Sequence, residues 1–246
     1  MLKLREKYKV QFDQIDFSSK ITMNGISSMM QVIAANHASL LGFNYYKNSD
    51  TASYYWILSR VKYVIESYPK WEDEVEMETY PGGYDKLFAV RLFDIYSKNQ
   101  EKIGYIIGDY VLIDSAKMRP VSLKGQQGEL ACLDFPYQGE KLKKLTLPKG
   151  ISIRQEKRKA YYSEMDLNGH MNNAHYIKWI VDLLPIAIFE EYEIHTLEVN
   201  YNTSITYGVE VYTELIKEDI CHYTVCGMNE ERTIQYFIAC IELKAI

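Results

Sequence analysis

Residues 166–184 read Asp-Leu-Asn-Gly-His-Met-Asn-Asn-Ala-His-Tyr-Ile-Lys-Trp-Ile-Val-Asp-Leu-Leu, and the fold of the second half of the chain follows from this stretch. Apolar residues in its second part recur at the spacing of one helix face; they are Tyr176, Ile177, Ile180, Val181 and Leu184. We therefore predict a helix from Asn173 to Leu184, which Pro185 ends or kinks because proline has no N–H to donate.

Strand-like segments surround this helix and repeat an order already present in the first half. In the second half we predict strands near 156–164, 194–204, 208–217, 220–228 and 232–244. In the first half we predict a strand at 8–16, a helix from Asn24 to Phe43, and strands at 55–68, 73–81, 86–97 and 103–114. A long helix packed on an antiparallel sheet, twice over, is an α+β fold of two tandem domains.

The stretch 117–150 has little periodicity and is rich in proline and glycine, as a linker would be. We divide the chain into an N-terminal domain at 1–135, a basic linker at 136–155 and a C-terminal domain at 156–246. Asp16 and Asp166 stand 150 positions apart, each between a strand and a long helix. The order of elements, rather than sequence identity, supports an internal repeat.

Composition excludes several classes of function. A net charge of -5 and a pI near 5.6 argue against a general nucleic-acid binder. No apolar run is long enough for a transmembrane helix, and the first residues do not form a secretory signal. Because we find no export signal, we expect a cytoplasmic protein with reduced thiols. The four cysteines form no C-x-x-C pair and the histidines form no H-E-x-x-H motif, so we expect neither metal nor cofactor.

The polar cluster Asp166, Asn168 and His170 places an acid, an amide and an imidazole in five residues at a turn that enters a helix. Histidine suits proton transfer near neutral pH, and an amide can donate to a carbonyl oxygen. The same residue types are also ordinary helix caps, and Asn172 or Asn173 is expected to cap this helix. From the residues alone, catalysis and capping both remain open.

The run Asp166-x-Asn168-x-His170-x-Asn172-Asn173-x-x-Tyr176-Ile177, followed by Trp179, resembles the signature of the acyl-ACP thioesterases of plants and bacteria. Looser matches to that family's N-terminal half follow; they are Trp56-Ile-Leu-Ser-Arg60, Pro69-Lys-Trp71, Glu78-Thr79, and Val111-Leu-Ile-Asp114 before Arg119-Pro120. The resemblance covers nearly the whole chain. It implies a double hot-dog fold and hydrolysis of fatty acyl thioesters on acyl carrier protein, which ends fatty acid synthesis.

The resemblance also implies residue roles. Asp166, Asn168 and His170 would be catalytic: His170 and Asn168 would position the thioester carbonyl or the attacking water, and Asp166 would orient them. N–H groups at the start of the second helix would help to hold the oxyanion. Asn172 and Asn173 would contact substrate. The partner would be acyl carrier protein, and the chain would be a monomer or a homodimer.

One departure from the family concerns the plant enzymes' Glu-Cys pair, about 38 residues after the aspartate. Ser204 stands there, flanked by Thr203 and Ile205, with Glu198 six positions earlier. Either Ser204 or Thr203 holds the water, or Asp166 is the base.

At offset 150 the first half has Ser18 and Lys20 instead of Asn168 and His170, so we predict one active site per chain. The first domain would supply the acyl pocket, lined by Met29, Met30, Ile33 and Trp56, although for any single one of these residues plain core packing is the preferred interpretation.

The basic residues of 141–159 have two interpretations, a solvated surface or a docking patch for an acidic carrier protein. The alternatives to acyl-ACP hydrolysis are an acyl-CoA thioesterase of the same fold and a non-catalytic acyl-binding or regulatory protein.

Overall fold

The computed structural model describes residues 3–42, 54–114, 116–117, 119–125 and 132–246. The chain divides into two compact units. Unit 1 comprises Met1–Ile21, Ser28–Val61 and Ser67–Leu142, and unit 2 comprises Thr22–Ser27, Lys62–Glu66 and Lys143–Ile246. The division falls between Leu142 and Lys143, inside the stretch predicted to be the linker.

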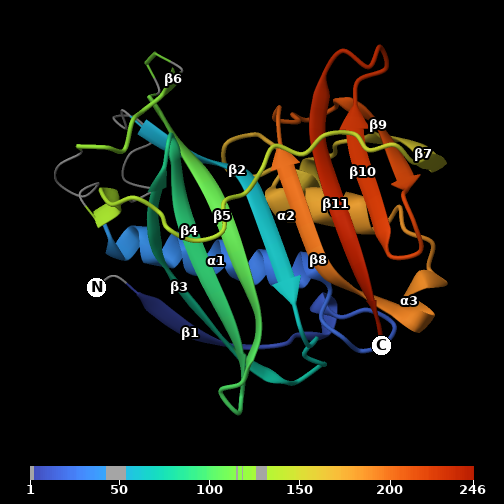
Figure 1. Ribbon diagram of the computed structural model, residues 1–246, viewed down its shortest axis with the longest axis horizontal. Helices are drawn as coiled ribbons and strands as arrows, with labels where there is room; N and C mark the ends of the chain where they lie inside the picture. Colours follow the sequence, from blue (N-terminus) through green and yellow to red (C-terminus); the bar gives the residue numbers. More distant parts are fainter. Residues whose placement is uncertain (1–2, 43–53, 115, 118, 126–131) are drawn as a thin grey trace. The chain divides into compact units, whose positions relative to one another are not determined.

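The first half of the chain forms an antiparallel sheet with a long helix against it (Figure 1). Its elements are β1 (Leu4–Lys9), the 3-10 helix η1 (Phe12–Gln14), α1 (Met23–Leu40), β2 (Tyr54–Ile65), β3 (Glu74–Asp85), β4 (Phe88–Ser97), β5 (Lys102–Asp114) and the short β6 (Arg119–Pro120). The strand order is β1-β3-β4-β5-β2, with β6 paired to β5. Helix α1 buries Met29, Met30 and Ile33, as their helical spacing predicts, but Leu40, which the same spacing places on the apolar face, is exposed at the last position of the helix.

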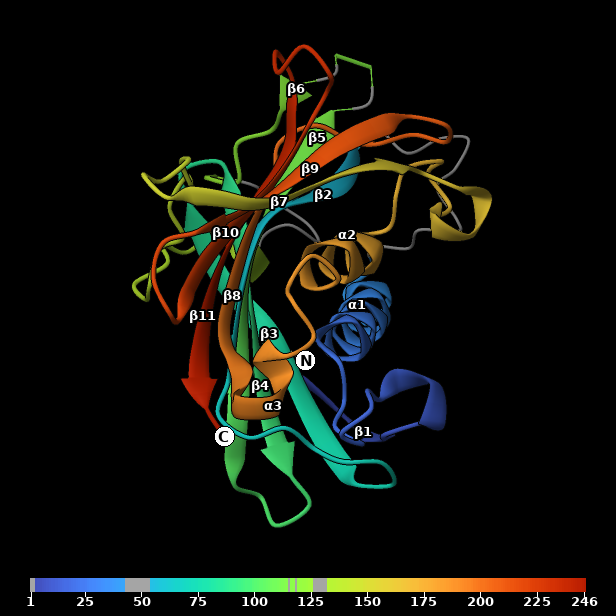
Figure 2. The same ribbon diagram turned by 90° about the vertical axis from the view of Figure 1, so that its right-hand side faces the viewer.

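The second half repeats this arrangement. Its elements are β7 (Ile151–Lys159), η3 (Tyr162–Glu164), α2 (Asn173–Val181), α3 (Ile188–Glu191), β8 (Tyr192–Tyr201), β9 (Glu210–Lys217), β10 (His222–Met228) and β11 (Gln235–Ala245). The strand order is β8-β11-β10-β9-β7, and α2 lies on one face of these strands (Figure 2). The Tyr176 ring of α2 packs edge-on against Tyr201 of β8 and Phe237 of β11, with ring centroids 5.1 and 5.6 Å apart.

Both predicted helices are shorter than the periodicity suggested. Helix α1 ends at Leu40, because Gly42 adopts a left-handed φ of 94° that stops the helix; Phe43 lies outside the described residues. Helix α2 ends at Val181 rather than Leu184. The guanidinium of Arg154 donates to the main-chain carbonyls of Asp182 and Leu183 just beyond it, which satisfies acceptors that a continuing helix would have used.

Strand β7 begins at Ile151, five residues before the predicted strand and inside the predicted linker. It is an edge strand whose side chains are mostly exposed and charged, so it lacks the apolar alternation by which strands are found in a sequence. Half of the basic run 141–159 therefore belongs to a strand.

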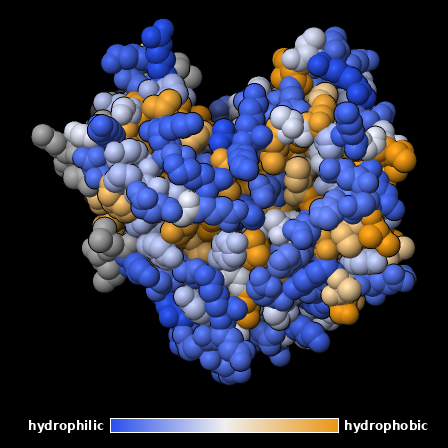
Figure 3. All heavy atoms as spheres, viewed as in Figure 1, coloured by the Kyte–Doolittle hydropathy of each residue, from blue (hydrophilic) through white to orange (hydrophobic). Residues whose placement is uncertain are grey.

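The surface is predominantly hydrophilic on the face drawn in Figure 3, with apolar residues in small groups among the polar ones, as expected of a chain that is 25% charged. No helix in the described part of the chain is both long and apolar enough to cross a bilayer.

Candidate active site

The loop before α2 is organised by the Asp166 carboxylate. Its Oδ1 accepts hydrogen bonds from the main-chain N–H groups of Asn168 (2.8 Å) and His170 (3.2 Å), and the Asp166 N–H donates to the His170 carbonyl (2.7 Å). Gly169 takes a left-handed φ of 73°, which glycine adopts without strain. The carboxylate thus closes a tight turn from which the side chains of Asn168 and His170 are exposed to solvent.

The N–H groups after this turn are almost all used within the protein. Asn172 caps α2, as predicted, with its Oδ1 accepting from Ala174 N at 2.9 Å. The N–H of Met171 donates to Ile205, that of Asn172 donates to Glu164, and that of His175 donates to Asn172. Asn173 is the exception in this stretch: the described part of the structure shows no acceptor for its main-chain N–H.

The loop after β8 lies against the motif loop. Met171 N donates to the Ile205 carbonyl (2.8 Å), and His170 forms an antiparallel bridge with Thr206. Ser204, which is exposed, is therefore held two residues from the partner of His170. The structure brings together Asp166, Asn168, His170 and the loop that carries Thr203 and Ser204.

Glu198 is directed elsewhere. It alternates along β8 with Val199 and Tyr201, which are on the α2 side, and its carboxylate forms an ion pair with Lys62 at 3.4 Å. Its charge is already engaged on the opposite face of the sheet. Glu198 is therefore a poor substitute for the glutamate of the plant enzymes.

The first half contains the same turn without the same side chains. Asp16 Oδ1 accepts from Ser18 N (2.8 Å) and Lys20 N (3.2 Å), and Asp16 N donates to the Lys20 carbonyl (2.9 Å). The 3-10 helix before each aspartate and the antiparallel bridge after it also recur. The first-half turn forms without an asparagine or a histidine, so Asn168 and His170 are not required to build this conformation.

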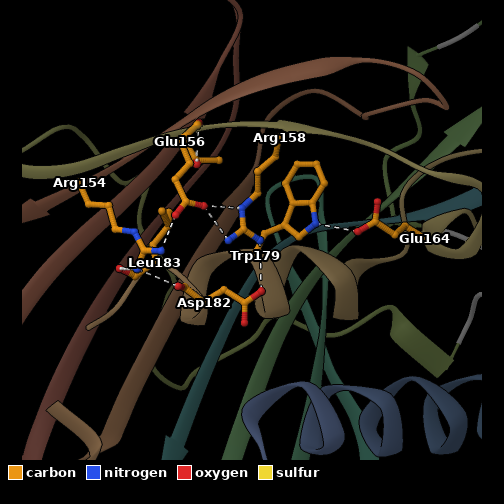
Figure 4. A network of polar contacts seen from close by, with 8 residues as sticks. Arg154, Glu156, Arg158, Glu164, Trp179, Asp182 and Leu183 are labelled. Atoms are coloured by element: carbon orange, nitrogen blue, oxygen red, sulfur yellow. Dashed lines mark hydrogen bonds and ion pairs between the residues drawn. The ribbon is translucent and has the colours of Figure 1, made fainter. Parts of the chain in front are cut away.

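A polar network braces the motif loop and α2 (Figure 4). Glu164 Oε2 accepts from the Tyr161 N–H (2.9 Å), and its Oε1 accepts from the indole N–H of Trp179 (2.7 Å). The guanidinium of Arg158 lies over the Trp179 ring, 5.8 Å from the centroid, and binds Glu156 and Asp182. Glu164, two residues before Asp166, was missed from the sequence. Its capping-box position, three residues after Tyr161, was the available signal.

The four residues predicted to line an acyl pocket all lie in unit 1. Met29, Met30 and Ile33 are almost wholly buried. Trp56 is half-buried and packs on a core cluster that contains Ala89 and Leu112. This packing agrees with an apolar interior and equally with plain core.

A surface pocket of unit 2 lies away from the motif loop, on β7, β9 and β10. Among its lining residues, Glu214 accepts from Gln155 (2.9 Å) and pairs with Arg232 (3.3 Å). It shares no lining residue with the motif. Within the described residues, no group of three His, Cys, Asp or Glu side chains is spaced to hold a metal ion.

Comparison with known families gives two matches. Residues 1–127 match the model of the acyl-ACP thioesterase N-terminal domain, and residues 152–237 match that of the C-terminal domain. Among curated proteins, the chain is 26% identical over 223 residues to the chloroplastic oleoyl-acyl carrier protein thioesterase of Coriandrum sativum, covering 81% of this chain and 58% of that protein. It is 23% identical over 219 residues to the chloroplastic palmitoyl-acyl carrier protein thioesterase of Arabidopsis thaliana, covering 81% and 52%. The chain thus spans somewhat more than half the length of these relatives.

Solved structures agree over the whole chain. The acyl-ACP thioesterase from Bacteroides thetaiotaomicron superposes with a TM-score of 0.86 at 22% identity, covering 98% of each chain. The 12:0-ACP thioesterase from Umbellularia californica gives a TM-score of 0.85 at 19% identity, covering 100% of this chain and 98% of that one. The predicted α+β double hot-dog fold is confirmed.

Proposed function

The chain belongs to the acyl-ACP thioesterase family, and on that premise we propose that it hydrolyses the thioester between a fatty acyl chain and the phosphopantetheine arm of acyl carrier protein, ending fatty acid synthesis. The observation that carries the proposal is the contrast between the two halves. Both build the same aspartate turn, but the second half alone places an amide and an imidazole on it, at Asn168 and His170.

In the proposed reaction, water adds to the thioester carbonyl carbon and the C–S bond breaks, giving a free fatty acid and a thiol. His170 accepts the proton of the attacking water and returns a proton to the leaving sulfur. The Asn168 amide donates to the carbonyl oxygen as negative charge develops there. Because Oδ1 of Asp166 is occupied by two N–H groups, we assign Asp166 to holding the loop rather than to being the base.

The N–H of Asn173 is the second donor that we propose for the oxyanion, because its neighbours are already bonded. Ser204 is proposed to orient the water from the opposite loop. Met29, Met30, Ile33 and Trp56 are proposed to contribute to the acyl-binding interior of the first domain, residues 1–135.

The carrier protein is proposed to dock on the basic residues of 141–159. Several of these charges are already paired: Lys141 with Asp85, Lys157 with Glu210, and Arg154 and Arg158 with Glu156. The cations without an ion pair in the described structure are Lys143, Lys144, Lys149 and Lys159. We propose that these four lysines meet the acidic partner.

The test is thiol release from acyl-ACPs and the matching acyl-CoAs of graded chain length, with His170→Ala alongside. Faster release from acyl-ACP that His170→Ala abolishes, with the fold intact by circular dichroism, is the expected result. Ser204→Ala is expected to lower kcat less than His170→Ala. Several acyl chain lengths must be tested, because relatives that are similarly identical to this chain are named for oleoyl, palmitoyl and dodecanoyl substrates.

Other results would redirect the assignment. Wild-type turnover in His170→Ala would remove the imidazole from the mechanism. Equal rates with acyl-CoA would favour the acyl-CoA thioesterase. No release from any thioester would leave a non-catalytic acyl-binding protein, for which the missing glutamate at Ser204 is the motivating observation.

A further inference from the structure

Tyr176 connects helix α2 to the loop that carries Ser204. Its hydroxyl oxygen accepts a hydrogen bond from the main-chain N–H of Ile205 at 3.0 Å. Tyr176 and Ile205 are both buried, with exposed fractions of 3% and 0%. A buried N–H must find an acceptor inside the protein, and here that acceptor is the Tyr176 hydroxyl on helix α2.

Ile205 is bonded on both sides. Its N–H is held by Tyr176, and its carbonyl accepts from Met171 N at 2.8 Å. Ser204 directly precedes Ile205, and His170 directly precedes Met171. The two hydrogen bonds of Ile205 therefore set the position of Ser204 relative to His170.

The first half shows what the same junction looks like without a site. There Ile21 N donates to the Pro69 carbonyl at 2.8 Å, which repeats the bond from Met171 to Ile205. Pro69 and Ile205 are 136 positions apart. The isolated bridges repeat this offset: Lys20 pairs with Lys70 in the first half, and His170 pairs with Thr206, 136 positions after Lys70, in the second. Proline has no N–H to satisfy, and the helix position that corresponds to Tyr176 is Ile26, which has no hydroxyl. Donor and acceptor are both present in the second half and both absent from the first.

The hydroxyl is suited to a fixed, neutral role. Burial raises the pKa of Tyr176 to about 12, although the bond from Ile205 N–H acts in the opposite direction, and the nearby charge of Asp166 raises it further. Tyr176 therefore stays protonated at neutral pH. Its ring is fixed edge-on between Tyr201 and Phe237.

We propose that Tyr176 is a positioning residue of the active site, whose hydroxyl holds the 202–206 loop so that Ser204 faces the Asn168–His170 turn. This inference rests on the proposed hydrolysis and adds a residue to it. The Tyr176 hydroxyl acts through the main chain of Ile205 and does not touch the thioester.

The test is Tyr176→Phe, which keeps the ring packing and deletes only the hydroxyl. The kcat for acyl thioester hydrolysis is expected to fall about 10- to 100-fold, as for a misplacement of reacting groups by roughly 1 Å, with KM changed less than about twofold. Hydrogen exchange at the Ile205 amide is expected to accelerate, while the amides of β10 and β11 keep their protection. The matched control is Tyr223→Phe, which deletes the hydroxyl of another buried tyrosine of unit 2, on β10 away from the loop.

The outcomes separate the two proposals. An active wild type with unchanged kcat in Tyr176→Phe overturns the positioning role. A fall in kcat that Tyr223→Phe matches, with equal losses of Tm, makes Tyr176 an ordinary core residue and also overturns it. An inactive wild type contradicts the hydrolase proposal instead. In that case, unaltered hydrogen exchange at the Ile205 amide in Tyr176→Phe would overturn the positioning role of Tyr176 without any reference to activity.

Discussion

At the scale of single residues, the two aspartates 150 positions apart do the same work. Asp16 and Asp166 each accept two main-chain N–H bonds and close a turn of the same shape. Position 19 is serine with a φ of 62°, and position 169 is glycine with a φ of 73°. The two halves therefore share the turn and differ in the side chains on it, to which we assign the proposed chemistry.

This comparison predicts how Asp166 variants behave. Asp166→Asn keeps an acceptor at Oδ1, so it is expected to retain hydrolysis within about tenfold of wild type. Asp166→Ala removes both hydrogen bonds, each contributing about 1.5–3 kcal/mol with a charged acceptor, and is expected to lose most of the hydrolytic activity. Steady-state kinetics with one acyl-ACP measure the difference.

The matched control is Asp16→Ala, which removes the same bonds from the first half, for which we propose no catalytic role. It is expected to lower the free energy of unfolding and leave kcat near wild type. If Asp166→Asn is as inactive as Asp166→Ala, the carboxylate itself is the base and the assignment to loop positioning is wrong.

At the scale of elements, the start of α2 is a capped helix end, and we propose that it also donates to the oxyanion. Asn172 uses its side chain as the cap, and the described part of the structure shows no acceptor for the N–H of Asn173, the donor that we propose for the oxyanion. Proline is tolerated at the first position of a helix, and it requires an extended residue before it. Asn172 has φ -64° and ψ 138°, so the backbone already meets that requirement.

Asn173→Pro therefore removes one N–H with little strain. If that N–H holds the oxyanion, kcat is expected to fall about 10²- to 10³-fold, as for the loss of one such donor elsewhere. Asn173→Ala keeps the N–H and removes only the side chain, so it is expected to affect kcat far less. Equal kcat values for the two variants, with helix content unchanged by circular dichroism, would exclude this donor.

At the scale of the whole molecule, a buried carboxylic acid gives stability a pH dependence. Asp109 on β5 is 5% exposed, and burial raises its pKa from 3.8 to about 7; the charge of Arg60 opposes this shift and that of Asp85 adds to it. Between about pH 4 and 7 the native state holds a proton that the unfolded chain has released. The free energy of unfolding therefore falls as pH rises through this window.

Asp109→Asn removes that titration. At pH 8 the variant is expected to be more stable than wild type by on the order of 1–4 kcal/mol, and at pH 4 by much less. Urea denaturation at pH 4, 6 and 8 measures the difference.

Asp94→Asn is the control, because Asp94 is also buried but pairs with Lys102 and accepts from Tyr80. It is expected to destabilise the protein. A stability difference for Asp109→Asn that does not change with pH would contradict the linkage.

Most of the fold could be predicted from the sequence, because the features that define it are periodic. The apolar face of α1 and the alternating burial of β3 and β9 follow from consecutive residues, and so does the aspartate turn before each helix. The sequence predicts the start of β7 too far along the chain, because an exposed, charged edge strand has no apolar face by which to recognise it. The motif from Asp166 to Trp179 identified the family without any coordinates.

Pairing between distant segments is what only the tertiary structure decided. Nothing near Ser204 in the sequence indicates that Ile205 bonds to both Met171 and Tyr176, or that Glu198 is directed toward Lys62 on the other face of its strand. Nor does the sequence show that Asp166 gives one oxygen to the main chain, because a carboxylate two residues from an asparagine can equally act on a ligand. Local periodicity fixes which elements form, since it depends on neighbours along the chain, whereas the partners of a buried N–H or carboxylate depend on which strands and loops the folded core brings into contact.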